Sequence, residues 1–132
     1  MSLSPKGWAA AALLAAVAGC AQMQMSGEPD RSLVFFNDVS AELSPEARDT
    51  IAETAKRARD TGARAIRVEG RASPTGSPEA NKKLAEMRTF VVADALQQDG
   101  VGAATIRQVP IGEVRSDDPG VTDRRVDMVI ER

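Results

Sequence analysis

The stretch Ile66–Arg88, IRVEGRASPTGSPEANKKLAEMR, decides the fold because it combines a strand, a tight loop and the start of a helix. Ile66 and Val68 alternate with charged residues, which is the period of a half-buried strand. Gly70 ends that pattern, and further proline and glycine residues indicate a loop after it. Ser77 then stands at a helix N-cap position, with proline directly after it. The stretch therefore predicts a strand followed closely by a helix.

One face of this helix is predicted to be apolar. Its residues recur at steps of three and four, as Ala80, Leu84, Met87, Val91 and Ala95. Arg88 falls inside this face, where a cation must reach water or find an anionic partner. Asn81 lies two turns earlier on nearly the same line, so the two side chains are predicted to share a ligand. The alternative is that Arg88 is a core-edge residue paired internally, with Glu69 or Asp123.

The other segments predict an α+β domain. Before the stretch, they indicate a strand at 33–36 and a helix that opens at Ser44-Pro45, buries Ala47, Ile51, Ala55 and Ala58, and ends at Gly62. After it, the second helix ends near Gly100, and a strand at 105–111 contains Pro110, which favours a sheet edge or a bulge. A polar loop at 116–122 and a terminal strand around Val126, Met128 and Ile130 follow. The expected order is β-α-β-α-β-β, with two helices packed on one mixed four-stranded sheet.

Residues 1–19 are predicted to be a lipoprotein signal peptide. Lys6 supplies a positive charge, and the apolar run 8–17 is too short for a bilayer span, which needs roughly 20 residues. The run ends in Val17-Ala18-Gly19-Cys20, which resembles a bacterial lipobox, whose cysteine is acylated. Cys20 is the only cysteine, so the chain has no internal disulfide. The alternatives are an ordinary signal peptide with a stray cysteine, or a short membrane anchor.

Residues 20–30 are predicted to be the acylated cysteine and a flexible tether, and residues 31–132 a single periplasmic domain. The segment 1–19 holds one base and no acid, so the 17 bases and 19 acids of the chain become 16 and 19, a net charge of −3. That balance argues against nucleic acid as a partner. The chain has no histidine, so Ser-His and Cys-His catalysis and metal sites built on histidine lack their residues. The sequence predicts no enzyme, no cofactor and no metal site.

Motifs spaced along the whole domain carry a family resemblance. They are Val34-Phe35-Phe36 with the run 40–47, Val68-Glu69-Gly70, Thr75-Gly76, Asn81, Leu84 and Arg88, then Gly112-Glu113 and Asp123-Arg124-Arg125-Val126-Asp127. In this order they resemble the OmpA-like C-terminal domain family. The resemblance implies binding of peptidoglycan stem peptides, in particular of the diaminopimelate residue, with Arg88 clasping a ligand carboxylate.

Several positions depart from that family pattern. Where the family has His-Thr-Asp, this chain has Arg71-Ala72-Ser73, so a hydroxyl replaces the carboxylate that binds the ligand ammonium. Arg71 is expected to repel that ammonium further. Val39 replaces another family Asp, with Asp38 as its substitute one position away, and Asp123 replaces an Asn. Losing an ionic partner for the ammonium costs about 1.5–3 kcal/mol, or ten- to a hundredfold in affinity.

These observations predict an outer-membrane lipoprotein that is anchored through Cys20 and faces the periplasm. Its domain is expected to associate non-covalently with diaminopimelate-type peptidoglycan and to link envelope and wall. Ala21 favours the outer membrane, because Asp at that position favours retention in the inner membrane. The predicted ligand-binding residues are Arg88, Asn81, Ser73, Arg71 and Asp38. The alternative is a structural module, or one that binds envelope proteins, which has kept the fold and lost the wall ligand.

Overall fold

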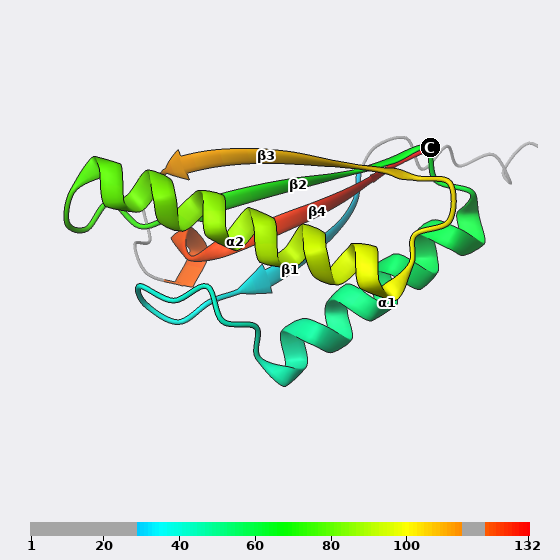
Figure 1. Cartoon of the computed structure of the whole chain (residues 1–132), viewed down its shortest axis with the longest axis horizontal. Coiled ribbons are helices and arrows are strands. Elements are labelled where there is room, and N and C mark those ends of the chain that lie inside the picture. Colours follow the sequence, from blue (N-terminus) through cyan, green and yellow to red (C-terminus); the bar gives the residue numbers. More distant parts are fainter. Residues whose placement is uncertain (1–28, 115–120) are drawn as a thin grey trace, which may run out of the picture.

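A computed structural model describes residues 29–114 and 121–132 (Figure 1). The elements follow in the order β1 (Asp30–Phe35), α1 (Pro45–Thr61), β2 (Ala65–Ala72), α2 (Pro78–Asp99), β3 (Thr105–Glu113), the short 3-10 helix η1 (Val121–Asp123) and β4 (Arg125–Glu131). This order confirms the predicted α+β arrangement. Within the described residues, no helix is long and apolar enough to cross a membrane.

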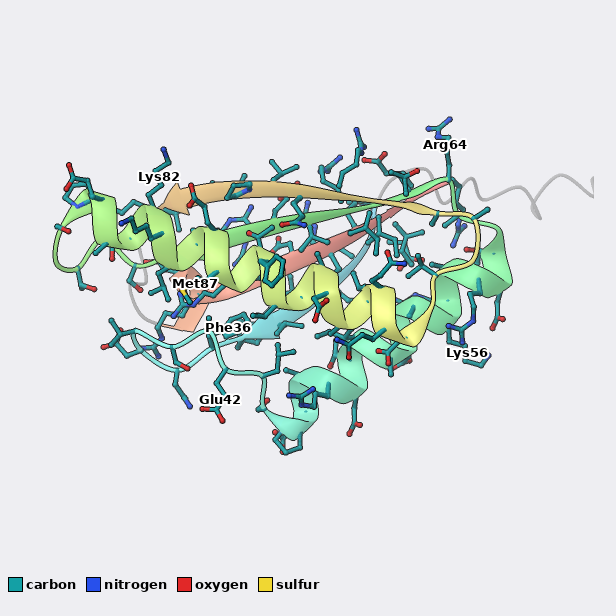
Figure 2. The ribbon with its side chains drawn as sticks, in the orientation of Figure 1. Phe36, Glu42, Lys56, Arg64, Lys82 and Met87 are labelled. Atoms are coloured by element: carbon teal, nitrogen blue, oxygen red, sulfur yellow. The ribbon has the colours of Figure 1, made fainter. Side chains whose placement is uncertain are left out.

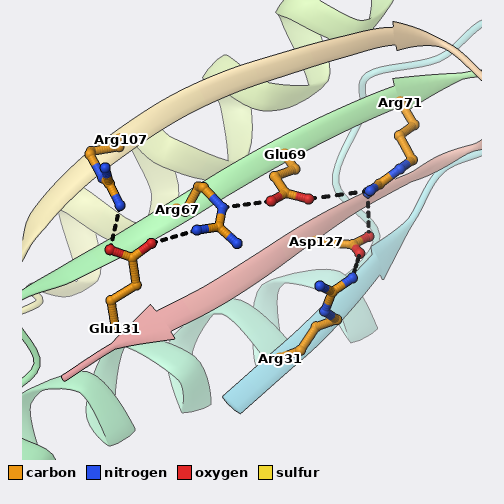
Figure 3. Close-up of polar contacts among 7 residues, drawn as sticks. All are labelled: Arg31, Arg67, Glu69, Arg71, Arg107, Asp127 and Glu131. Carbon is orange, nitrogen blue, oxygen red and sulfur yellow. Dashed lines mark hydrogen bonds and ion pairs between the residues drawn. The ribbon is translucent and has the colours of Figure 1, made fainter. Parts of the chain in front are cut away.

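The strands form one mixed sheet in the order β1-β4-β2-β3. The last strand of the sequence, β4, is inserted between β1 and β2 and is antiparallel to both, whereas β3 pairs parallel with β2. Helix α1 packs against β1, helix α2 packs against β2 and β3, and the two helices contact each other (Figure 1). We call the side of the sheet that they cover the helix face. The open face is the opposite side, which carries Arg67, Glu69 and Arg71 of β2 with Asp127 and Glu131 of β4 (Figure 3).

The core lies between the helix face and the two helices. It joins Ile51 of α1 and Leu96 of α2 to Val68 and Met128 of the sheet, all of which are fully buried. Alternate residues of the central strands supply the sheet side of this core, as the period-2 pattern predicted. The charged residues between them therefore face the other way.

Both helices begin as the sequence predicted. The hydroxyl of Ser44 accepts a hydrogen bond from the Ala47 amide at 3.0 Å, and the hydroxyl of Ser77 accepts one from the Ala80 amide at 3.1 Å. Each cap satisfies an amide that has no partner within its helix. Gly62 ends α1 in the left-handed conformation, with a φ of 64°. The chain thus enters and leaves α1 through local chemistry that the sequence specifies.

The apolar face predicted for α2 is wrong by one residue. The helix buries Asn81, Ala85, Arg88, Thr89, Val92, Ala93 and Leu96, whereas Ala80 is exposed and Met87, on the outside of the helix, is 59 % exposed (Figure 2). One residue is a rotation of about 100° around the helix. Apolar residues follow both lines of α2, so periodicity alone could not choose between them. Arg88 belongs to the buried line.

The ends of several elements also differ from the predictions. β1 begins at Asp30, one residue inside the predicted tether, and β3 runs on to Glu113. Pro110 does lie in an edge strand, next to a register shift at which Ile111 has no partner on β2. Cys20, with the predicted signal peptide and most of the tether, lies outside the described residues, as does most of the predicted loop at 116–122.

Candidate functional site

Arg88 is the largest fully buried side chain in the described structure, and its guanidinium binds three backbone carbonyls. Nε donates to the carbonyl of Ser40 at 2.7 Å, Nη2 to that of Asn37 at 2.9 Å and Nη1 to that of Arg71 at 3.1 Å. The guanidinium carbon also lies 5.2 Å from the centre of the Phe36 ring, within the range of a cation–π contact. One side chain of α2 therefore joins the end of β2 to the segment that follows β1.

The positive charge of Arg88 is not balanced by a carboxylate. No Asp or Glu of the described residues forms an ion pair with it. Burial, together with a smaller effect of the nearby charge of Arg124, lowers the pKa of Arg88 to about 10, whereas Asp38 acts in the opposite direction. The group stays protonated at neutral pH. Arg88 is thus a buried cation held by three carbonyls and the Phe36 ring. The predicted internal pairing with Glu69 or Asp123 is wrong in its partners.

Gly70 sets the depth at which α2 lies on the sheet. A Cβ atom at this position would lie 2.0 Å from the Thr89 hydroxyl oxygen and 2.5 Å from the Ala85 carbonyl oxygen. Only glycine permits so close an approach. The same approach carries Arg88, one residue before Thr89, to the carbonyl of Arg71, one residue after Gly70. The glycine of the Val68-Glu69-Gly70 motif therefore positions the guanidinium.

The side chain of Arg71 lies on the open face and not beside the guanidinium of Arg88. Its Nη2 atom is 3.2 Å from a Glu69 oxygen, and its Nη1 atom is 2.9 Å from an Asp127 oxygen (Figure 3). Gly70 and Ala72 face α2, so strand alternation turns the residue between them outward. The expected repulsion of a ligand ammonium by Arg71 has no geometric basis here. Arg71 contributes its carbonyl to the Arg88 site.

The remaining predicted residues do not share the hydrogen bonds of Arg88. Asn81 is buried and donates from Nδ2 to the Glu113 carboxylate of β3 at 3.4 Å. Asp38 is exposed and acts on Arg88 through its charge. Ser73 lies just beyond β2, and its buried hydroxyl oxygen has no partner among the described residues. Its neighbourhood is therefore polar but incompletely satisfied.

Comparison with known proteins identifies the chain. The model of the OmpA family matches residues 35–126, which include the Arg88 site. The chain belongs to the OmpA family.

Solved structures share the fold of this OmpA-family domain at low sequence identity. The peptidoglycan-associated lipoprotein of Burkholderia pseudomallei matches with a TM-score of 0.66 and 24% identity, over 75% of this chain and 89% of that chain. The OmpA-like domain of FopA1 from Francisella tularensis matches with a TM-score of 0.59 and 21% identity, over 75% and 70%. The periplasmic domain of MotB from Helicobacter pylori has a TM-score of 0.59 and 20% identity, over 74% and 69%.

Two residues beside the site of this OmpA-family domain were not predicted as ligand residues. Asp123 is 1 % exposed, and its Oδ2 atom has no hydrogen-bond partner among the described residues; the same holds for the buried Nε atom of Arg124. The Arg124 carbonyl accepts a hydrogen bond from the Phe36 amide at 2.8 Å, which places this segment next to the ring that Arg88 contacts. The sequence held a signal, because both residues belong to the closing motif, but strand order was needed to bring them here.

Chemically, the site offers guanidinium donors and few acceptors. Among residues 29–114 and 121–132, no group of three Asp, Glu, His or Cys side chains is arranged to hold a metal ion. A buried arginine without a carboxylate partner is instead suited to an anionic ligand group, since charge-assisted hydrogen bonds are stronger than those to neutral carbonyls.

Proposed function

We propose that this protein associates non-covalently with peptidoglycan, and that Arg88 receives a carboxylate of the peptide stem. The proposal is supported by membership of the OmpA family and by the fold shared with a protein named as a peptidoglycan-associated lipoprotein. The observation that carries it is the uncompensated buried charge of Arg88. A guanidinium has five N–H donors, and three of these are directed at carbonyls in this structure.

A ligand carboxylate reaches Arg88 only if the segment from Asn37 to Ser40 moves, because the side chain has no exposed surface. Two of the three carbonyls that bind the guanidinium come from this segment. Val39, at its tip, is 81 % exposed and has a φ of 51°, a conformation that a β-branched residue rarely adopts. Strain at Val39 reduces the cost of displacing the segment. The ligand carboxylate, which carries a full negative charge, then takes the place of a neutral carbonyl as the partner of the Arg88 guanidinium.

We further propose that acylation of Cys20 anchors the protein to the outer membrane with the domain in the periplasm. β1 begins at Asp30, ten residues after Cys20. Ten residues extend to at most about 35 Å. The domain would therefore stay near the inner surface of that membrane, within reach of the wall.

The second candidate function is a module for protein partners that has lost wall binding. One observation favours it: each nitrogen of the Arg88 guanidinium already donates to a carbonyl, and the side chain is closed to solvent. In this case Arg88 is a structural residue that ties α2 to β2. The loss of the family carboxylate at Ser73 fits this function as well.

Sedimentation with purified diaminopimelate-type sacculi separates the two functions. The detergent-solubilised full chain is expected to sediment weakly, and less so at high salt. Ser73→Asp should increase retention about tenfold by supplying a charged hydrogen bond. Ser73→Asn, of nearly equal size but uncharged, is the matched control and should gain nothing. If neither the native chain nor Ser73→Asp sediments, the partner-module function replaces the wall-binding one.

A further inference from the structure

Three buried polar atoms, on residues that follow β2 or precede β4, lack hydrogen-bond partners among the described residues. They are the hydroxyl oxygen of Ser73, the Oδ2 atom of Asp123 and the Nε atom of Arg124. Buried polar groups are almost always paired, and an unpaired one carries a desolvation penalty that a ligand can relieve. Two of these atoms accept hydrogen bonds and the third donates.

The strand register brings these residues to one end of the sheet. β2 and β4 pair antiparallel as far as Gly70 opposite Val126, so the residues that follow β2 and those that precede β4 lie at the same end of the sheet. Phe36 continues the pairing of β1 with β4 by donating its amide hydrogen to the Arg124 carbonyl. Its ring also lies under the guanidinium of Arg88. The three unpaired atoms therefore belong to residues at the end of the sheet where Arg88 binds the Arg71 carbonyl.

The chemistry of this cluster matches a zwitterion. Arg88 and Arg124 supply positive charge for a carboxylate, while the Asp123 oxygen and the Ser73 hydroxyl are acceptors for an ammonium group. Asp123 pairs with no base among the described residues at ion-pair distance. A cationic group of the ligand can therefore form the ion pair that Asp123 lacks.

We propose that Asp123 binds the ammonium group of the stem-peptide ligand, with the Ser73 hydroxyl as a second acceptor. This inference rests on the proposed wall binding and extends it to the cationic end of the ligand. Asp123, at the end of η1, thereby supplies the carboxylate that is missing at Ser73. The specificity of the site for a free amine then depends on Asp123.

The test compares retention of the full chain on native sacculi and on sacculi whose free amines have been acetylated. For the native protein, acetylation should lower the apparent affinity about ten- to a hundredfold, the range of a lost charged hydrogen bond. Asp123→Asn should show the same loss on native sacculi and no further loss on acetylated ones. Asp99→Asn makes the same change of charge at an exposed position on α2 and should behave like the native protein on both.

Each outcome decides a different claim. If Asp123→Asn binds native sacculi as well as the native protein does and stays equally sensitive to acetylation, the ammonium is bound elsewhere and this inference falls while wall binding stands. If the native protein sediments with neither preparation and Ser73→Asp does not restore sedimentation, the proposed function itself fails. The comparison of native and acetylated sacculi needs no variant, so it decides the inference even if Asp123→Asn does not fold. If acetylation leaves retention of the native protein unchanged, the inference is overturned. Ser73→Asp added to Asp123→Asn should restore the sensitivity.

Discussion

The two faces of the sheet use arginine in opposite ways. On the open face, every arginine of a continuous network meets carboxylates: Arg107–Glu131–Arg67–Glu69–Arg71–Asp127–Arg31 (Figure 3). On the helix face, Arg88 meets three carbonyls and the Phe36 ring, and it forms no ion pair with a described carboxylate. Each arginine of this network has a carboxylate partner within the fold, so the network needs no ligand. Arg88 has no carboxylate partner among the described residues, and this difference makes it the candidate binding residue.

A single strand builds both environments. The side chains of Arg67, Glu69 and Arg71 alternate along β2 with Val68 and Gly70, which face the helices. Asp127 is the centre of the open-face network: it is fully buried and contacts Arg31 at 2.6 Å, Arg125 at 2.8 Å and Arg71 at 2.9 Å. The long arginine side chains cover this carboxylate from solvent. Buried charge is thus tolerated on one face through pairing and on the other through carbonyls.

The largest effect is expected from Arg88→Ala. The change leaves three carbonyls without donors, each at a cost of about 1–3 kcal/mol, so the free energy of unfolding should fall by at least about 3 kcal/mol. Arg88→Lys should lower the free energy of unfolding less, because the ammonium keeps the charge. It should still lower it, because the ammonium cannot reach all three carbonyls. Urea unfolding of the two variants measures both. A loss below about 1 kcal/mol for Arg88→Ala would show that the carbonyls find other partners, and that Arg88 is held less firmly than the structure indicates.

An intermediate effect is expected from Asp127→Asn. The amide cannot balance three arginines, and the free energy of unfolding should fall by about 1.5–3 kcal/mol. Arg31 and Arg125 are partly exposed and recover some hydration, which keeps the loss below that of Arg88→Ala. Retention of the folded variant on sacculi should equal that of the native protein. Reduced retention without reduced stability would contradict the separation of the two faces.

Much of this fold was predictable because its signals are local. Ser44 and Ser77 cap their helices through hydroxyls three residues from the amides they bind, and alternation along the central strands fixed which residues enter the core. Alternation also held the information that places Arg71, together with Arg67 and Glu69, on the open face. The sequence interpretation missed this because it assigned Arg71 from its position in a motif and not from its strand.

The site was less predictable because it depends on contacts between distant segments. The buried line of α2 is chosen by the close approach at Gly70, which periodicity along the helix does not contain. Arg88 was still found, since a cation among apolar residues stands out on either line. Asp123 comes to the same end of the sheet as Ser73 only because β4 is inserted beside β2, and nothing within either segment specifies that strand order.

The pKa of Glu69 links the open-face network to acid stability. Burial raises this pKa, but the hydrogen bond and charge of Arg67, together with the charge of Arg71, outweigh it and leave the pKa below its ordinary value of 4.5. A carboxyl whose pKa is lowered by folding stabilises the folded state above its unfolded pKa. That contribution disappears as the pH falls through the lower, folded pKa.

The smallest effect is therefore expected from Glu69→Gln, and it is confined to a pH window. Because the glutamine does not titrate, the difference in unfolding free energy between native protein and variant should be largest above about pH 5 and should shrink as the pH falls below 4.5. Urea midpoints measured from pH 7 to pH 3 give this difference. Asp60→Asn is the control for an exposed carboxylate. Lys56 lowers the pKa of Asp60, with a smaller contribution from Arg59, and the change should alter stability little at any pH. If Glu69→Gln gives a difference that does not vary with pH, Glu69 does not titrate as part of the network, and charge compensation on the open face rests on Asp127 and Glu131.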